Sequence, residues 1–315
     1  MQPNPDQGVK LTVDELLALR QQASVLDLAS KYQVSSTLAG GYRSKFRGRG
    51  MDFDEVRLYQ AGDDIRNIDW RVTARTGKAH TKLFKEERER PVFILVDQSP
   101  RLFFGSRHAF KSVMAARATA LLVWACVNAG SRIGGVIFDD EDHIEHRPSG
   151  RRREALSFLR KVTERHNQVF ERLINSNVSD NHQSLEKSLA RLRRLAKPGS
   201  LIYLFSDFQN LTPDAIRHLS RLCRHNELQA YMLTDPLDYH LPPRGVYSVT
   251  DGSSINQFHT GSKAMSENYE SHFQSHLQSL DTLFKQHKIL FEQLSTTDDI
   301  KVVLAAANTP RLITP

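Results

Sequence analysis

Cysteine is scarce in this chain of 315 residues, which has only Cys126 and Cys223. Each of them stands in an apolar stretch with helical character. So few cysteines in so long a chain argue against a disulfide framework. The sequence therefore indicates a protein of a reducing compartment.

A long apolar run is also missing. The most apolar stretch, ATALLVWACVNAG, is too short and too closely flanked by charged residues to span a bilayer. The first residues, MQPNPDQGVK, are polar and do not resemble a signal peptide. These features predict a cytoplasmic protein without a membrane span, in which residues 1–11 form a disordered tail.

Motifs for several kinds of chemistry are absent as well. No HExxH motif occurs, and His272 and His276, four residues apart, have no obvious third metal ligand. The stretch GSRHAFKS is only superficially like a phosphate-binding loop, because it lacks the second glycine before the lysine. ATP hydrolysis by this chain is therefore disfavoured.

Positive charge, in contrast, is in excess. The 43 lysines and arginines outnumber the 36 acids and give a formal net charge of +7. Four of the cations fall on every second residue and would point the same way in an extended chain: Arg43, Lys45, Arg47 and Arg49. This basic comb could grip a phosphate or an acidic partner. It could equally be a solvated edge strand, where charge blocks aggregation.

A nucleic-acid or polyanion binder is the first alternative function. It would use the basic comb together with three arginines at the start of an expected helix, Arg151–Arg153. Single-stranded nucleic acids are commonly bound by interleaved aromatic side chains, and here only Tyr42 and Phe46 accompany the comb. A nucleic-acid partner is therefore disfavoured.

Strands and helices alternate through most of the chain. PVFILVD (91–97), SLIYLFSDF (200–208) and ELQAYMLTD (227–235) are apolar runs typical of strands buried on both faces. Helical segments separate them, which predicts an α/β fold with a mostly parallel sheet flanked by helices. We expect this domain over residues 91–315. An N-terminal helix, opened by Thr12 and Glu15, and a small β-rich decoration would occupy residues 12–90.

Three of the expected strands end in acids, namely Asp97, Asp207 and Asp235. Sheets of this kind bind ligands at the carboxyl ends of their strands. Carboxylate and hydroxyl oxygens are ligands that Mg²⁺ prefers. The sequence therefore offers a candidate Mg²⁺ or Mn²⁺ site made by Asp97, Ser99 and Asp207. A metal-dependent hydrolase at Asp97 and Asp207 is the second alternative function.

The same residues carry a resemblance to a known fold. DQS after the first apolar strand and the later LFSD resemble the metal-ion-dependent adhesion site of the von Willebrand factor A fold. The motif of that site is DxSxS, followed by a Thr on a separate loop and an Asp after a later strand. Arg101 stands where the second serine is expected, and Gln183 or Ser184 where the threonine is expected. The resemblance implies a von Willebrand factor A-like fold with a degenerate adhesion site. The structural alternative is that Asp97 and Ser99 cap a turn and that Arg101 pairs with Asp97 or Asp207.

A second constellation, RLYQAGDDIRNIDWRVTART, covers residues 57–76. Ile68 and Trp70 share a parity, so in an extended segment they would point to one apolar face. Asp69 would then face nearby arginines (Arg66, Arg71 or Arg75) and make charge-assisted hydrogen bonds. The stretch could be a structural network that holds the segment to the sheet, or a recognition surface for a partner. No nucleophile with a base and its orienting group occurs within it.

Together with RGMDF before it and KLFKEERERPVFILVDQS after it, this stretch closely resembles the bacterial domain-of-unknown-function 58 (DUF58) family. That family's pattern includes R-x-Y-x-x-GDD-x-R-x-IDW ahead of a von Willebrand factor A-like strand. The matching residues that form the candidate partner-binding or structural network are Arg57, Tyr59, Asp63, Asp64, Arg66, Asp69, Trp70, Arg75, Lys82 and Glu86.

Members of this family are commonly encoded beside MoxR-type AAA+ ATPases and other von Willebrand factor A proteins. The resemblance thus implies a non-enzymatic interaction module, with such an ATPase and such proteins as partners. It would act as an adaptor or co-chaperone in the assembly of protein complexes or metalloenzymes.

Overall fold

The chain forms two compact units. The computed structural model describes residues 8–26, 51–60, 63–86, 90–175, 183–209, 211–250 and 255–308. One unit, here called the body, comprises Met1–Lys31 and Arg90–Pro315, and the other, here called the insert, comprises Tyr32–Glu89. The sequence grouped residues 12–90 together, whereas the contacts assign the N-terminal helix to the body.

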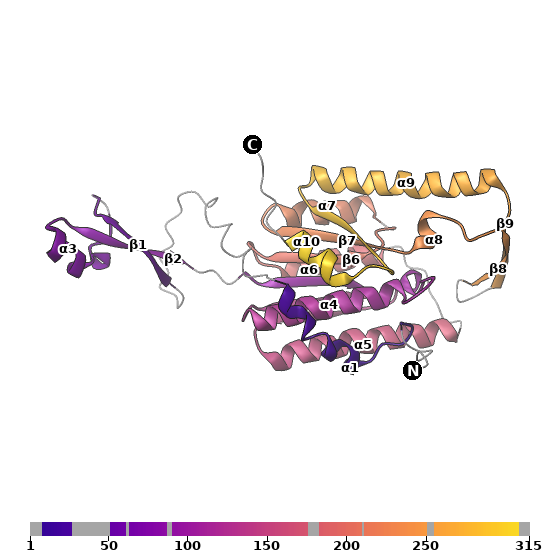
Figure 1. Ribbon diagram of the computed structural model, residues 1–315, viewed down its shortest axis with the longest axis horizontal. Coiled ribbons are helices and arrows are strands. Elements are labelled where there is room, and N and C mark those ends of the chain that lie inside the picture. The colour runs from indigo at the N-terminus through magenta and orange to yellow at the C-terminus, as the bar shows by residue number, and fades with distance from the viewer. Residues whose placement is uncertain are drawn as a thin grey trace. The chain divides into compact units, whose positions relative to one another are not determined.

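A six-stranded sheet in the order β10-β7-β6-β3-β4-β5 forms the centre of the body (Figure 1). Five of its strands run parallel, and the edge strand β5 runs antiparallel to β4. The strands are β3 (Val92–Asp97), β4 (Ile133–Phe138), β5 (His143–Ser149), β6 (Leu201–Ser206), β7 (Glu227–Thr234) and β10 (Leu290–Ser295). This arrangement confirms the predicted α/β, von Willebrand factor A-like fold class.

Helices cover both faces of the sheet, because alternate side chains of a strand point to opposite faces. Phe93 and Leu95 of β3 pack into a core with α6 (Ser184–Leu195), α7 (Pro213–Cys223) and α9 (Lys263–Gln286). The intervening Val92, Ile94 and Val96 are fully buried as well. The opposite layer consists of α4 (Lys111–Asn128), α5 (Arg152–Ile174) and α10 (Ile300–Asn308). A fully apolar strand is therefore explained by burial on both sides.

The N-terminal segment is held on α4 and α5. The His166 ring donates from Nε2 to the carbonyl of Val9 at 2.9 Å, and Asn167 exchanges two hydrogen bonds with the backbone of Leu11. The prediction of a disordered tail is thus wrong for residues 8–11, while residues 1–7 lie outside the described ranges. Sequence reasoning missed this because the partners of the segment lie about half the chain away.

The short helix α1 (Val13–Ala18) continues this attachment. Thr12 caps it by accepting a hydrogen bond from the amide of Glu15, as the sequence predicts. Leu16 is fully buried, and its carbonyl accepts a hydrogen bond from the indole of Trp124 on α4 at 2.9 Å. Arg117 of α4 pairs with Glu15. Packing on α4 therefore fixes a helix that would be too short to persist alone.

The insert is a hairpin with a helical excursion at its turn. Strand β1 (Met51–Leu58) pairs antiparallel with β2 (His80–Glu86). Between them lie the 3₁₀ turn η3 (Ile65–Asn67) and the helix α3 (Trp70–Thr76). Gly77 ends α3 in the left-handed conformation, with φ of 70°, which a glycine adopts without steric cost. The basic comb lies outside the described residues.

The remaining elements of the body lie between β7 and α9. The short helix α8 (Pro236–Tyr239) is followed by an antiparallel hairpin of β8 (Gly245–Thr250) and β9 (Ile255–Thr260). Among the residues that the structure describes, no helix combines the length and the apolar character needed to cross a bilayer.

Leu16→Ala tests the attachment of α1. The change removes a fully buried side chain, so we expect the free energy of unfolding to fall by about 2–5 kcal/mol, measured by urea denaturation. Leu19→Ala, at a half-buried position just after α1, is the matched control and should cost less. Equal and small losses for both variants would show that α1 does not contribute to the core.

Candidate functional site

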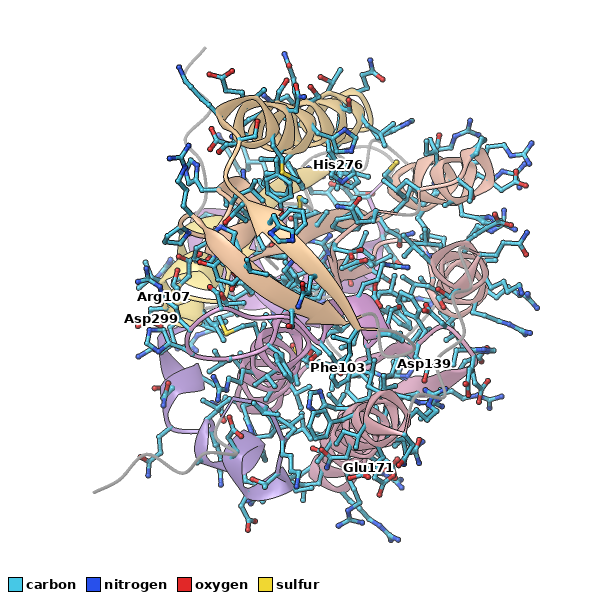
Figure 2. The ribbon with its side chains drawn as sticks, turned by 90° about the vertical axis from the view of Figure 1, so that its right-hand side faces the viewer. Phe103, Arg107, Asp139, Glu171, His276 and Asp299 are labelled. Atoms are coloured by element: carbon cyan, nitrogen blue, oxygen red, sulfur yellow. The ribbon has the colours of Figure 1, made fainter. Side chains whose placement is uncertain are left out.

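Acidic side chains gather at the carboxyl edge of the six-stranded sheet, as the sequence predicts. Asp97 ends β3, Asp207 follows β6 and Asp235 follows β7. The labelled Phe103 and Asp139 mark the loops after β3 and β4 in Figure 2. Because β3 and β6 are paired neighbours, Asp97 and Asp207 belong to one site.

Asp97 is completely buried and accepts hydrogen bonds on both carboxylate oxygens. Its Oδ1 receives the amide of Ser99 at 2.8 Å and the hydroxyl of Ser99 at 2.5 Å. Its Oδ2 receives the hydroxyl of Ser206 at 2.6 Å. Burial raises the pKa of Asp97 to about 7, and the charge of Asp207 adds to this rise, whereas Arg101 and the two serine hydroxyls oppose it. The carboxyl group therefore ties the end of β3 to the end of β6.

Arg101 provides the positive charge of this site. Its Nε lies 3.3 Å from Oδ2 of Asp207. Burial works to lower the pKa of Arg101, but the carboxylates of Asp207, Asp97 and Asp140 outweigh burial and raise it. The guanidinium is thus a permanent cation within a group of carboxylates. This agrees with the alternative that Arg101 pairs with Asp207.

The donor set at this edge does not fit a divalent ion well. Both oxygens of Asp97 are engaged by hydroxyl and amide donors, and Asp207 faces a guanidinium. Ser184, at the position of the expected loop threonine, donates to Asp140 at 3.3 Å. The described ranges also hold no group of three histidine, cysteine or acidic residues that could bind a metal ion. A metal at Asp97, Ser99 and Asp207 stays a prediction, and this arrangement favours Arg101 as the resident cation.

Asp235 has a structural role. It caps α8 by accepting the amide of Leu237, and it accepts the amide of Ser106 and the hydroxyl of Thr296 at 2.5 Å. Burial works to raise the pKa of Asp235, but these hydrogen bonds outweigh it and hold the pKa below its usual value. Asp235 therefore links the loop after β7 to the loops after β3 and β10.

The acids of the signature stretch stabilise the insert locally. Asp63 pairs with Arg57 at 2.8 Å, and Asp64 accepts the amide of Arg66 at the start of η3. Asp69 caps α3 and lies 3.6 Å from Lys82. The expectation that Asp69 faces the arginine side chains is wrong, because its carboxylate is held at the end of the helix.

The expected apolar face of Ile68 and Trp70 is also wrong. Ile68 and Trp70 would share a face only in an extended segment. Trp70 is instead the first residue of α3, and it is 68% exposed. Ile68 is half-buried and bridges Thr81 of β2. The helix begins here because Asp69 is a strong cap, a signal that the sequence shows and that favours a helix over a strand.

The other members of the predicted network lie apart from the sheet edge. The backbone amide of Tyr59 extends the hairpin ladder to Ala79. Arg66 and Arg75 are exposed. Glu86 pairs with Met51 at the end of the ladder, and its side chain lies outside what the structure describes. Within the described part of the insert, the signature is therefore a local scaffold together with exposed side chains.

Sequence reasoning missed a buried polar cluster beside the site. The side-chain amide of Gln98 donates from Nε2 to the carbonyl of Ser112, and its Oε1 lies 3.1 Å from Nδ1 of His166. The Nε2 atom of His166 donates to the carbonyl of Val9. Burial lowers the pKa of His166 to about 4, so this imidazole is neutral at physiological pH. The spacing of these residues gives no signal, because they come from four separate segments of the chain. The cluster connects the strand-end loop to the N-terminal segment.

The raised pKa of Asp97 predicts a particular dependence of stability on pH. Between pH about 4 and pH about 7 the folded chain keeps the Asp97 proton that the unfolded chain releases, so the contribution of this group to stability falls as pH rises. Asp97→Asn removes this titration. We expect the free energy of unfolding of the wild type, relative to Asp97→Asn, to fall by on the order of 4 kcal/mol over this range.

The control for this experiment is Asp235→Asn, because the pKa of Asp235 is lowered rather than raised. Above pH about 5, Asp235 is ionised in both states, so the difference between the wild type and this variant should be constant. Urea denaturation at several pH values measures both differences. A constant difference for Asp97→Asn would contradict the raised pKa.

Arg101→Ser tests whether the guanidinium excludes a divalent ion. The change removes a positive charge and supplies the hydroxyl that the adhesion-site motif expects. We expect Mn²⁺ binding, followed by calorimetry, to strengthen by at least about tenfold in the variant, because a like charge at close range is removed. Arg101→Lys, which keeps the charge, is the control. Equally tight binding of Mn²⁺ to the wild type would show that the site holds metal beside Arg101.

Comparison with known proteins agrees with the resemblance found in the sequence. Two uncharacterized proteins, Rv1480 of Mycobacterium tuberculosis and Mb1516 of Mycobacterium bovis, are each 28% identical to this chain over 230 residues. Each of these alignments covers 73% of this chain and 69% of the relative.

Among solved structures, the conserved hypothetical protein BatB from Bacteroides thetaiotaomicron is similar over 69% of this chain and 96% of its own, with a TM-score of 0.45 and 13% identity. A von Willebrand factor type A protein from Catenulispora acidiphila is similar over 49% of this chain and 34% of its own, with a TM-score of 0.30 and 14% identity. Neither similarity assigns a role to any residue.

The family model described as "Protein of unknown function DUF58" matches residues 55–279. This range begins in the insert and extends through most of α9, so it includes both the signature stretch and the carboxyl edge of the sheet. The chain therefore belongs to the DUF58 family.

Proposed function

We propose that this chain is a non-enzymatic interaction module that acts as an adaptor or co-chaperone of a MoxR-type AAA+ ATPase. Its task would be the assembly of protein complexes or metalloenzymes, in which other von Willebrand factor A proteins would also be partners. The family is of unknown function, and the link to such ATPases comes from the resemblance of the signature stretch.

One observation carries the non-enzymatic part of the proposal, namely the closed chemistry of the carboxyl edge. Asp97, Ser99 and Ser206 are at most 1% exposed, and the two serine hydroxyls donate to the carboxylate. A nucleophile and its base must reach a substrate, which such burial prevents. The reactive groups of the site therefore stabilise the fold.

The nearest buried histidine supports the same conclusion. His166 donates from Nε2 to the carbonyl of Val9, and its Nδ1 lies 3.1 Å from Oε1 of Gln98. This imidazole is fully buried and its pKa is lowered to about 4, so it is a weak base that a substrate does not reach. Within the described ranges, this burial supports a site without the nucleophile–base–orienter arrangement typical of hydrolases.

The division into two units supports an adaptor. The body carries its own sheet and core, and the insert carries its own hairpin and capped helix. Two compact units on one chain provide two surfaces for partner proteins. This is the arrangement that an adaptor between an ATPase and its client needs.

The proposal predicts direct binding to a MoxR-type ATPase of the same organism. We expect a Kd of about 1 μM or tighter, corresponding to about −8 kcal/mol, in at least one of the nucleotide-free, ADP and ATP-analogue states. Biolayer interferometry measures this affinity, and the ATPase rate is followed in parallel. An AAA+ ATPase of another family is the control. Absence of binding in all three states, with an unchanged ATPase rate, would refute the adaptor role.

A further inference from the structure

The outward face of α3 carries an exposed tryptophan beside two exposed arginines. Trp70, Arg71, Ala74 and Arg75 are all exposed, and their spacing makes them one contiguous stripe of the helix. Val72, on the other side, is half-buried. We call the four exposed residues the α3 surface. A tryptophan that is 68% exposed leaves a large apolar area in contact with water.

The acids around α3 are engaged inside the insert. The Oδ1 atom of Asp69 accepts the amides of Arg71 at 3.0 Å and Val72 at 3.1 Å, and Lys82 lies near its Oδ2. Asp64 is held by the amide of Arg66, and Asp63 is paired with Arg57. The carboxylates nearest in sequence are therefore committed to backbone or hairpin groups.

The two arginines of the α3 surface are consequently left with no ion pair to any residue that the structure describes. Arg71 and Arg75 are four residues apart on one helix, where like charges repel each other. A pair of carboxylates supplied from outside would relieve this repulsion and could bind the guanidinium groups in bidentate fashion. The charge of the surface thus indicates an acidic partner.

We propose that the α3 surface is the docking site for an acidic surface of a partner protein, with Trp70 as its apolar anchor and Arg71 and Arg75 as its carboxylate-binding groups. Tryptophan and arginine are the residues that most often dominate the binding energy of protein interfaces. The inference rests on the proposed function, because it identifies the part of this chain that would contact the ATPase.

The surroundings of Trp70 favour a protein over a nucleic acid. Ile65, on the preceding turn, is 63% exposed, and Ala74 adds further aliphatic area. Burial of aliphatic side chains stabilises a protein interface, whereas single-stranded nucleic acids are bound by successive stacked aromatics. Tyr59, a neighbouring aromatic of the insert, is half-buried and adds no second exposed ring.

The tryptophan content of the chain allows the surface to be probed directly. The chain has two tryptophans, and Trp124 is 1% exposed. The difference in fluorescence between the wild type and Trp70→Phe therefore reports Trp70. Iodide, an anion, should quench this difference signal at least about twofold more strongly than caesium, because of the nearby arginines. Equal quenching by the two ions, or none, would overturn the description of the surface.

The binding test uses the full chain and the MoxR-type ATPase of the same organism. Trp70→Ala and the double variant Arg71→Gln/Arg75→Gln should each weaken binding at least about tenfold. These side chains are exposed, so the variants should fold, which circular dichroism checks. Lys78→Gln, an exposed cation just past the end of α3, and Val302→Ala, a 64% exposed apolar residue of α10, are the matched controls and should bind like the wild type.

The outcomes separate the two proposals. Loss of binding in the α3 variants alone, with protection of Trp70 from acrylamide in the complex, supports the docking site. Binding of the wild type and of the α3 variants with equal affinity overturns the docking site and leaves the adaptor role standing. A wild type that fails to bind in any nucleotide state removes both. Protection of Trp70 by a single-stranded dT oligonucleotide, and not by the ATPase, overturns the protein partner.

Discussion

The hydrogen bond from Ser206 to the buried carboxylate of Asp97, 2.6 Å long, is the interaction on which the carboxyl edge of the body depends. It joins the ends of two neighbouring parallel strands. The other carboxylate oxygen of Asp97 accepts hydrogen bonds from the amide and the hydroxyl of Ser99. Two carboxyl groups so close together in a buried place require a compensating charge. Arg101 supplies it from within the chain, at Asp207. In this way the edge of the sheet at which many proteins bind ligands is here held together by hydrogen bonds and by the pairing of Arg101 with Asp207.

The insert also contains acids and arginines close together, but its arginines on α3 are not paired with its acids. Its acids are also engaged by nearby groups, but these are backbone amides and hairpin cations, not the arginines of α3. The charge that remains is therefore outward-facing and positive, and it stands beside an exposed indole. At the carboxyl edge of the body Arg101 pairs with Asp207, whereas in the insert Arg71 and Arg75 are exposed. This contrast is the physical reason for placing recognition in the insert rather than at the strand ends.

The apolar strands could be predicted from the sequence because burial on both faces leaves a continuous pattern, as in β3 and β6. The pairing of Arg101 with Asp207 could be stated as an alternative, since strand order brings the two together. The exposure of Trp70 could not be predicted from the alternation of side chains along a strand, because Asp69 starts a helix here and the segment is not extended. The docking of residues 8–11 on α5 depends on His166 and Asn167, whose long-range contacts leave no local pattern.

The attachment of the N-terminal segment has a consequence for the order of events during synthesis on the ribosome. Leu11 leaves the exit tunnel long before its partner Asn167, which is 156 residues later in the chain. The strands of the insert are close in sequence, so their pairing does not depend on residues that emerge later. Helix α1, in contrast, packs on α4 and α5 and cannot do so until both have emerged. Residues 8–11 are thus among the last of the described residues to reach their contacts in the body.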